Sequence, residues 1–251
     1  MRITVLGCGT STGVPVLGCR CAVCTSVDPR NRRTRSSAVV HVDGKNILID
    51  TSTDLRAQSL ANKIERVDAV LYTHAHADHI CGIDDLRSFN FAQKSSIPCF
   101  GSADTIGRIK KMFDYIFDGN KGDSWKPDLS ATAVDAPFEA SGIKVTPIPI
   151  SHGKAAIFGY RIGDFAYLTD CSAVPDRSVK LLRGLKVLIL GALRHKPHPT
   201  HFSIEEAIAA SKIISPERTF FTHLGHSLDY ATDNELPEGC KLAYDGLTIT
   251  I

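Results

Sequence analysis

Residues 68–79 have the sequence DAVLYTHAHADH, in which an apolar run ends at a cluster of three histidines and one aspartate. The run from Ala69 to Tyr72 is short and apolar, which predicts a buried strand. The polar residues after it can converge on a metal ion only if the chain turns tightly, and the small side chains of Ala75 and Ala77 permit such a turn. This stretch therefore predicts metal ligands at the end of a strand, namely His74, His76, Asp78 and His79.

Three more potential ligands directly follow other predicted strands. His152 follows residues 145–151, Asp170 follows residues 165–169, and His223 follows residues 219–222. Residues at the ends of strands can reach one edge of a sheet, so we expect these side chains to meet the first cluster. Seven ligands are too many for one tetrahedral ion and suit two adjacent ions with a carboxylate between them.

Short apolar runs recur along the 251-residue chain, with helical patterns between some of them. We expect strands at residues 3–6, 38–42, 47–49, 69–72, 143–150, 158–162, 166–168, 187–190, 219–221 and 247–251. We expect helices at residues 55–64, 103–117, 175–183 and 203–213, the last opened by a capping box of Ser203 and Glu206. No repeat or long linker divides the chain, and ligands from residue 74 to residue 223 must meet. These features predict one layered α/β (α+β) domain over residues 1–251.

A second metal site is predicted from three closely spaced cysteines near the N-terminus, Cys19, Cys21 and Cys24. Structural zinc prefers closed fourfold coordination, and His226, three residues after His223, is our candidate for the fourth ligand. The competing interpretation is a set of free or redox-active thiols. The isolated cysteines are expected to be mostly small buried side chains; they are Cys8, Cys81, Cys99, Cys171 and Cys240.

The order of the seven ligands resembles the metallo-β-lactamase superfamily, and the match spans nearly the whole chain. The resemblance implies a four-layer αββα sandwich. It also implies a first ion on His74, His76 and His152, a second on Asp78, His79 and His223, and Asp170 as the bridge. Members with aspartate at the bridge mostly hydrolyse phosphoesters or thioesters, whereas true β-lactamases usually carry cysteine, so antibiotic hydrolysis is disfavoured.

The cysteine cluster beside the dinuclear site is similar to the family of cyclic phosphodiesterases of the bacterial carbon-phosphorus lyase pathway. Residues 7–15, 79–87 and 222–226 share the likeness. The resemblance implies a phosphodiesterase acting on a small cyclic or nucleotide-like phosphodiester, such as ribosyl 1,2-cyclic phosphate. Two divalent ions, zinc or manganese, would hold the attacking hydroxide between them, and one structural zinc would sit apart. A dinucleotide cofactor is not expected, because the third glycine of residues 7–13 comes one position too late.

His201 precedes a predicted helix and is our candidate general acid for the leaving group; the resembling family has a histidine at the matching position. Asp78 counts as catalytic as well as a ligand, since its loss is expected to abolish hydrolysis. His195 and His198 are open between substrate contact and plain surface exposure. Arg87 is open between phosphate binding and a structural ion pair. His41, on a predicted strand, is expected to be structural.

The charge and composition of the chain limit the kinds of binding partner that we expect. The formal net charge is +2, and no extended basic arm is present, which disfavours nucleic acid as a partner and with it a tRNA 3′-processing endonuclease. A glyoxalase II-like thioesterase and a non-catalytic metal-binding protein are two further candidate functions. The sequence has no run of ~18 apolar residues that would predict a membrane span, so we expect a cytoplasmic protein; a homodimer is one open interpretation of its oligomeric state. Residues 118–128, which include Trp125, are expected to form a surface loop.

Overall fold

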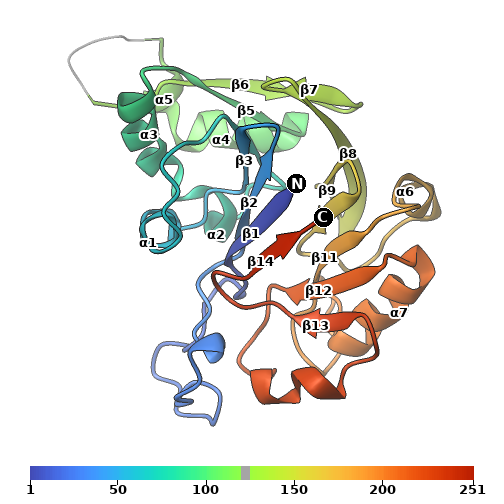
Figure 1. Ribbon diagram of the computed structural model, residues 1–251. Coiled ribbons are helices and arrows are strands. Elements are labelled where there is room, and N and C mark those ends of the chain that lie inside the picture. The colour runs from blue at the N-terminus through green and yellow to red at the C-terminus, as the bar shows by residue number, and fades with distance from the viewer. Residues whose placement is uncertain (120–124) are drawn as a thin grey trace.

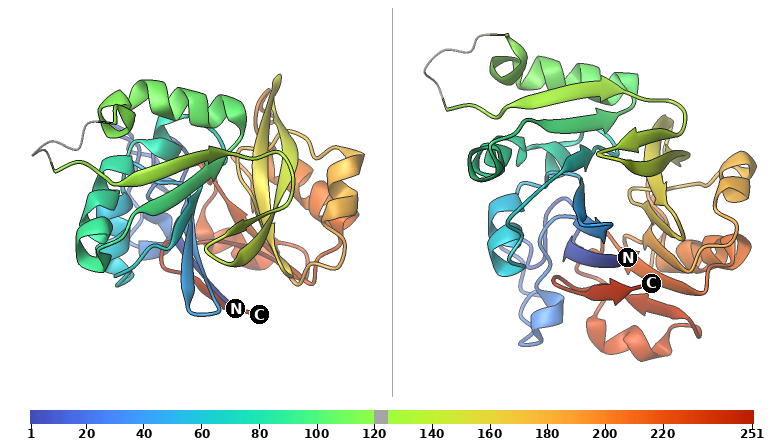
Figure 2. Two further views of the ribbon diagram at one scale, coloured as in Figure 1. Left: turned by 90° about the horizontal axis from the view of Figure 1, so that it is seen from above. Right: turned by 45° about the horizontal axis from the view of Figure 1, so that its top comes forward.

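The computed structural model describes residues 1–119 and 125–251. Two seven-stranded sheets pack face to face, and helices cover the outer face of each, as the two views in Figure 2 show. The structure therefore has the four-layer αββα arrangement that the resemblance implied. Both termini lie together (Figure 1), and the view from above places them at one edge of the sandwich (Figure 2). The predicted loop at residues 118–128 falls partly outside the described residues.

The first sheet combines antiparallel and parallel strands. In spatial order it contains β14 (Thr248–Thr250), β1 (Arg2–Gly7), β2 (Ser37–Val42), β3 (Lys45–Ile49), β4 (Ala69–Leu71), β5 (Ile97–Gly101) and β6 (Leu129–Ala133). Strands β3 to β6 are parallel, and β4 has every residue buried. A central parallel strand is covered on both faces, which explains why its sequence is a continuous apolar run.

The second sheet carries the other ligand-bearing strands. Its order is β13 (Cys240–Leu242), β12 (Arg218–Thr222), β11 (Val187–Gly191), β10 (Phe165–Leu168), β9 (Ala155–Ile162), β8 (Ile143–His152) and β7 (Phe138–Ala140). Strands β10 to β13 are parallel, and β7 to β10 are antiparallel. The apolar side chains between the two sheets belong to the larger core, and they include Ile3, Ile49, Leu71, Tyr160 and Ile189.

The helices divide between the outer faces. The first sheet is covered by α1 (Leu55–Ala61), α2 (Ala77–Ile80), α3 (Leu86–Gln93), α4 (Ala103–Met112) and α5 (Asp114–Phe117), and the second by α6 (Asp176–Leu181) and α7 (Ile204–Ile214) (Figures 1 and 2). Short 3-10 turns occur at η1 (Pro29–Asn31), η2 (Ile83–Asp85) and η3 (Tyr230–Glu235). The predicted capping box at the start of α7 is present, with Ser203 and Glu206 bonding each other's backbone amides.

Several element predictions were incomplete. The expected helix at residues 103–117 is two helices, because Phe113 leaves helical geometry, with φ −118° and ψ 46°. Helices α2 and α3 and strands β5, β6, β7 and β13 were not predicted. The missed strands β7 and β13 are three residues each, and Pro98 interrupts the pattern of β5. Such segments become strands by pairing with neighbours rather than by their own periodicity.

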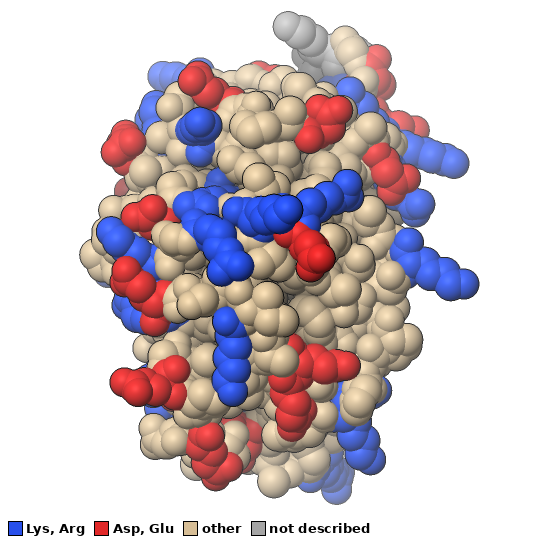
Figure 3. Space-filling view, turned by 90° about the vertical axis from the view of Figure 1, so that its right-hand side faces the viewer, with Lys and Arg blue, Asp and Glu red and all other residues tan. Residues whose placement is uncertain are grey.

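The surface has both signs of charge. On the face that bears α6 and α7, lysine and arginine side chains gather across the middle and aspartate and glutamate lie among them (Figure 3). Within the described residues, no helix is long and apolar enough to cross a membrane.

Candidate metal centre

The seven predicted ligands of the dinuclear site converge from both sheets. Their ligand atoms form two groups, each with its atoms within 4.8 Å of one another: His74, His76, His152 and Asp170, and then Asp78, His79, Asp170 and His223. Each group takes two residues from the loop and short helix after β4 and two from strand ends of the second sheet. The structure thus brings together all seven residues and places Asp170 in both groups.

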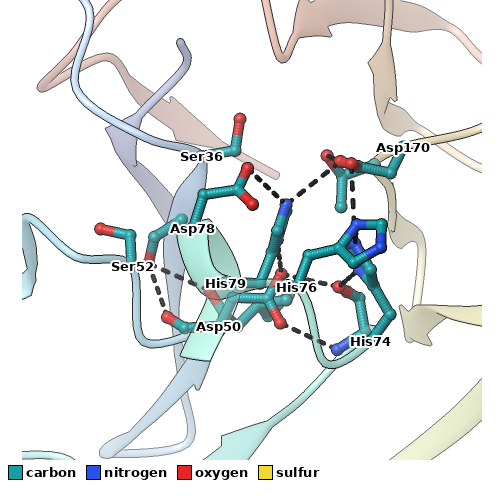
Figure 4. Close-up of polar contacts among 12 residues, drawn as sticks. Ser36, Asp50, Ser52, His74, His76, Asp78, His79 and Asp170 are labelled. Atoms are coloured by element: carbon teal, nitrogen blue, oxygen red, sulfur yellow. Dashed lines mark hydrogen bonds and ion pairs between the residues drawn. The ribbon is translucent and has the colours of Figure 1, made fainter. Parts of the chain in front are cut away.

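Asp170 lies between the two groups with one oxygen toward each. Its Oδ2 is 3.7 Å from the Nε2 of His74, whereas its Oδ1 is 3.3 Å from the Nε2 of His79 and 3.2 Å from that of His223. Figure 4 shows Asp170 facing the His74 and His79 side chains across the site. This is the arrangement required of a carboxylate shared by two cations.

Buried polar atoms without a hydrogen-bond partner indicate whether a cation fits the seven-ligand site. Asp78 Oδ2, His79 Nε2 and His223 Nε2 are buried and have no hydrogen-bond partner among the described residues. A buried polar atom without a partner costs free energy. These atoms face one another, with Asp78 Oδ2 3.2 Å from His79 Nε2 and 3.6 Å from His223 Nε2. A divalent cation among them would satisfy all three, so the residues fit such an ion.

Protein oxygens contact the second ring nitrogen of His152 and of His74. His152 donates from Nδ1 to the carbonyl of Thr200 at 2.8 Å, which leaves its Nε2 free as a ligand. The Nδ1 of His74 lies 3.0 Å from the hydroxyl of Thr73. Such contacts fix the orientation of a ligating imidazole and the position of its proton.

Asp50 completes this outer layer and was not predicted from the sequence. It follows β3 directly, lies beside His79 in Figure 4, and has its Oδ2 2.7 Å from His79 Nδ1. The backbone amide and hydroxyl of Thr73 both donate to it, at 2.8 Å each. The available signal was an aspartate directly after an apolar strand, the same pattern that led to Asp170.

Backbone strain is concentrated at this centre. Asp50, Asp170 and His223 each follow a strand and have positive φ values of 60°, 55° and 58°. Left-handed geometry is disfavoured for residues with a side chain, and it persists where the surrounding structure imposes it. Here it turns each side chain back toward the site at the strand end.

His201 lies close to both ligand groups. Its ring is 4.8 Å from those of His152 and His223, and its Nδ1 is 4.0 Å from Asp170 Oδ2. Burial and the adjacent His223 lower the pKa of His201 to about 3. The ring is therefore neutral in the free protein, and a negatively charged group beside it would raise its proton affinity.

The other candidate residues from the sequence lie at different distances from the ligand groups. His198 is half-buried, with its ring 5.2 Å from that of His201. His195 is exposed and 3.6 Å from Glu205. Arg87 pairs with Asp84 at 3.1 Å and so forms a structural ion pair, and His41 bonds Thr4 and Asn46 between strands, as a structural residue does.

The second predicted site is also assembled. The sulfur atoms of Cys19, Cys21 and Cys24 lie 3.3, 3.6 and 3.4 Å from Nδ1 of His226. Hydrogen bonding, first of all from the Cys24 backbone amide, lowers the pKa of Cys21 to about 7. Burial raises the pKa of Cys24 to about 11, so the fit to a structural zinc rests on the four ligand atoms in one closed group. No disulfide forms among the cysteines that the structure describes; Cys8, Cys99 and Cys171 are buried, Cys240 is half-buried and Cys81 is exposed.

A buried arginine links the N-terminal segment that carries the cysteine cluster to the loop that carries His223. Arg33, 2% exposed, donates to the carbonyls of Gly225 and Leu228 at 3.1 and 2.7 Å and to the side chain of Asn31 at 2.8 Å. The loop between His223 and Leu228 is thus fixed both by the cysteine cluster and by a guanidinium. No carboxylate forms an ion pair with this cation among the described residues; carbonyl oxygens and the Asn31 side chain accept its hydrogen bonds, and the charges of Asp229 and Asp245 also favour its charged form.

Comparison with known proteins agrees with this geometry. A family model described as "Beta-lactamase superfamily domain" matches residues 45–224. A solved structure, described as a new diphosphatase from the PhnP family, is 43% identical over the whole chain and 97% of its own, with a TM-score of 0.93. The chain belongs to the metallo-β-lactamase superfamily of hydrolases, in its PhnP-like branch. This confirms the fold and the family predicted from the ligand order.

Other relatives differ in name. A Porphyromonas gingivalis protein named octanoyltransferase is 37% identical over 257 residues, all of this chain but 52% of that protein, so the chain spans about half its length. A coenzyme PQQ synthesis protein B from Methylobacterium radiotolerans is 35% identical over 63% of this chain and 54% of its own. The structure of zinc-bound PqqB from Methylobacterium extorquens has a TM-score of 0.82 at 22% identity, with both chains fully covered, which shows the shared fold.

Proposed function

We propose that the protein is a metal-dependent phosphodiesterase that hydrolyses a small phosphodiester, cyclic or nucleotide-like, with two divalent ions, zinc or manganese, in the seven-ligand site. The observation that carries the proposal is Asp170, whose two oxygens face two separate ligand groups at 3.2–3.7 Å. When bound, two such ions supply Lewis acidity and an activated water for attack at phosphorus. The similarity to a PhnP-family diphosphatase supports a phosphorus-containing substrate.

The protein's own side chains would hold the ligating rings in place and protonate the leaving group. Thr200 and Asp50 orient ligating rings, so that the site is pre-formed when a substrate enters. His201, beside Asp170, would take up a proton from solvent when an anionic phosphodiester binds, because the added negative charge raises its proton affinity, and would then donate that proton to the leaving oxygen.

Other activities receive less support. The similarity to Bradyrhizobium diazoefficiens ribonuclease Z, 26% over 136 residues, and to the human short-form tRNase Z structure, 19% with a TM-score of 0.72, is similarity of fold. Surface cations that tRNA could use, such as Arg87 and Lys126, are paired with Asp84 and Asp118. A thioesterase of the glyoxalase II kind and a non-catalytic metal protein are the remaining candidates.

The test is hydrolysis by purified protein of known metal content. We expect turnover of bis(p-nitrophenyl) phosphate, 2′,3′-cyclic nucleotides or ribosyl 1,2-cyclic phosphate, and a loss of at least 10³-fold in Asp78→Ala, because a ligand is removed from the reacting centre. Asp104→Ala is the matched control, since Asp104 is an exposed carboxylate that pairs with Arg108.

Three results would contradict the proposal: undiminished activity in Asp78→Ala, turnover of a thioester but of no phosphodiester, or full metal occupancy without turnover of either class. A gel shift with tRNA at physiological salt would favour the tRNA-processing endonuclease instead.

A further inference from the structure

His198 lies on the segment between β11 and α7. Backbone hydrogen bonds and close packing hold this segment against the candidate metal centre. The amide of Leu193 donates to the carbonyl of Phe202 at 2.9 Å, and the amide of Phe202 donates to the carbonyl of Cys171, next to Asp170, at 2.6 Å. A Cβ on Gly153, next to His152, would lie 2.8 Å from the methyl group of Thr200, so the segment packs closely on the strand end. The position of His198 relative to the ligands is therefore fixed by the fold.

Thr200 connects His198 directly to a predicted metal ligand. Its carbonyl accepts from Nδ1 of His152 at 2.8 Å. Its amide and its hydroxyl lie 3.3 and 3.2 Å from Nδ1 of His198. A backbone N–H can only donate, so Nδ1 of His198 is the acceptor and the ring proton is on Nε2.

The Nε2–H of His198 is left free. It has no hydrogen-bond partner among the described residues, and the ring is only half-buried. The ring lies 5.2 Å from that of His201, which in turn is 4.8 Å from the rings of His152 and His223. His198 is thus the outer member of a row that runs from the ligands through His201 to the surface.

We infer that His198 is a substrate-binding residue whose Nε2–H donates to an oxygen of the leaving group beyond the one that His201 protonates. This inference rests on the proposed function, because it takes His201 as the neighbour of the leaving oxygen. It gives the substrate class: a phosphodiester whose leaving side carries further oxygen acceptors, such as a sugar, rather than a bare aryl or alkyl group. A site built to donate a hydrogen bond discriminates against substrates that lack the acceptor.

The test compares two substrates in three variants. 2′,3′-Cyclic AMP has a sugar on its leaving side, whereas bis(p-nitrophenyl) phosphate has no acceptor near the leaving oxygen. His198→Leu removes the donor, and we expect kcat/KM to fall about tenfold more for the cyclic nucleotide than for the aryl ester, mainly through KM, as one hydrogen bond requires. His198→Gln, which keeps an N–H at a similar reach, should recover most of this loss.

His195→Leu is the matched control, because His195 is an exposed histidine of the same segment that contacts Glu205. It should leave both activities and their ratio unchanged. An equal loss on both substrates in His198→Leu, with no recovery in His198→Gln, would mean that His198 only supports the loop. No loss on either substrate would also overturn the inference. If the wild-type protein hydrolyses neither phosphodiester, the proposed function itself fails.

Discussion

The carboxylate of Asp50 lies 2.7 Å from Nδ1 of His79, and neither side chain is exposed to solvent. This contact orients Nε2 of His79 toward the centre that it shares with Asp78 and Asp170. The other hydrogen bonds to the Asp50 carboxylate come from Thr73, whose hydroxyl also lies 3.0 Å from Nδ1 of His74, so Asp50 acts on His79 directly and on His74 through Thr73.

Asp50→Asn should weaken metal binding at the group of Asp78, His79 and His223 by about 10- to 100-fold, because the ring loses a charged orienting partner. Competition with a chromogenic chelator measures this affinity. Asp164→Asn, which changes an exposed partner of Lys186, is the control and should bind as the wild type does. Unchanged affinity in Asp50→Asn would assign Asp50 a purely structural part.

His201→Ala should show a dependence on the leaving group. Proton donation matters most when a poor leaving group departs, so we expect a loss of about 10²- to 10⁴-fold with a cyclic nucleotide and a much smaller loss with p-nitrophenolate as the leaving group. Both rates are measured on one metal-loaded preparation. Equal losses for the two substrates would argue against an acid role.

Arg33→Met should destabilise the protein by about 2–5 kcal/mol, because the carbonyls of Gly225 and Leu228 lose their donors inside the structure. Denaturant unfolding of the zinc-loaded protein measures the change. Arg32→Met, at the exposed neighbouring position, should be nearly neutral. Equal stability of the two variants would show that the hydrogen bonds of Arg33 to this loop do not stabilise the fold.

Cys21→Ser should lower the zinc content by one ion per chain and lower the melting temperature, since an incomplete ligand set no longer fixes His226. Elemental analysis and a thermal scan measure the two effects. Cys81→Ser, which changes an exposed cysteine outside both sites, is the control. Full zinc content in Cys21→Ser would exclude this cysteine as a ligand.

The sequence was most informative at the ends of strands, where the predicted metal ligands lie. The pattern at residues 68–79 and the single ligands after β8, β10 and β12 were enough to predict which side chains meet, because the ends of strands in one layer lie at one edge. The family resemblance supplied the layered fold. Neither periodicity nor spacing could supply the order of the strands, since the pairing of β3 with β4 and of β11 with β12 depends on the packing of both sheets.

What the sequence did not reveal depends on tertiary contacts. Asp50 has the same position after a strand as Asp170, but only the structure shows that it reaches a ligand ring instead of the centre. Phe113 ends a helix inside the predicted helical pattern that continues to Phe117, and β5 and β6 pair despite weak strand patterns. The ion pair of Arg87 with Asp84 likewise required coordinates to decide between two interpretations of one side chain.

Each of the two ligand groups takes half of its members from each sheet. Neither half of the chain can therefore capture an ion with a full set of donors, even if that half were folded. During synthesis the first group is complete only after β10, when Asp170 has been made, and the second only after β12, when His223 has been made. We therefore expect metal ions to bind late, after the two halves of the chain have packed together. A bound ion would then hold the two sheets against each other.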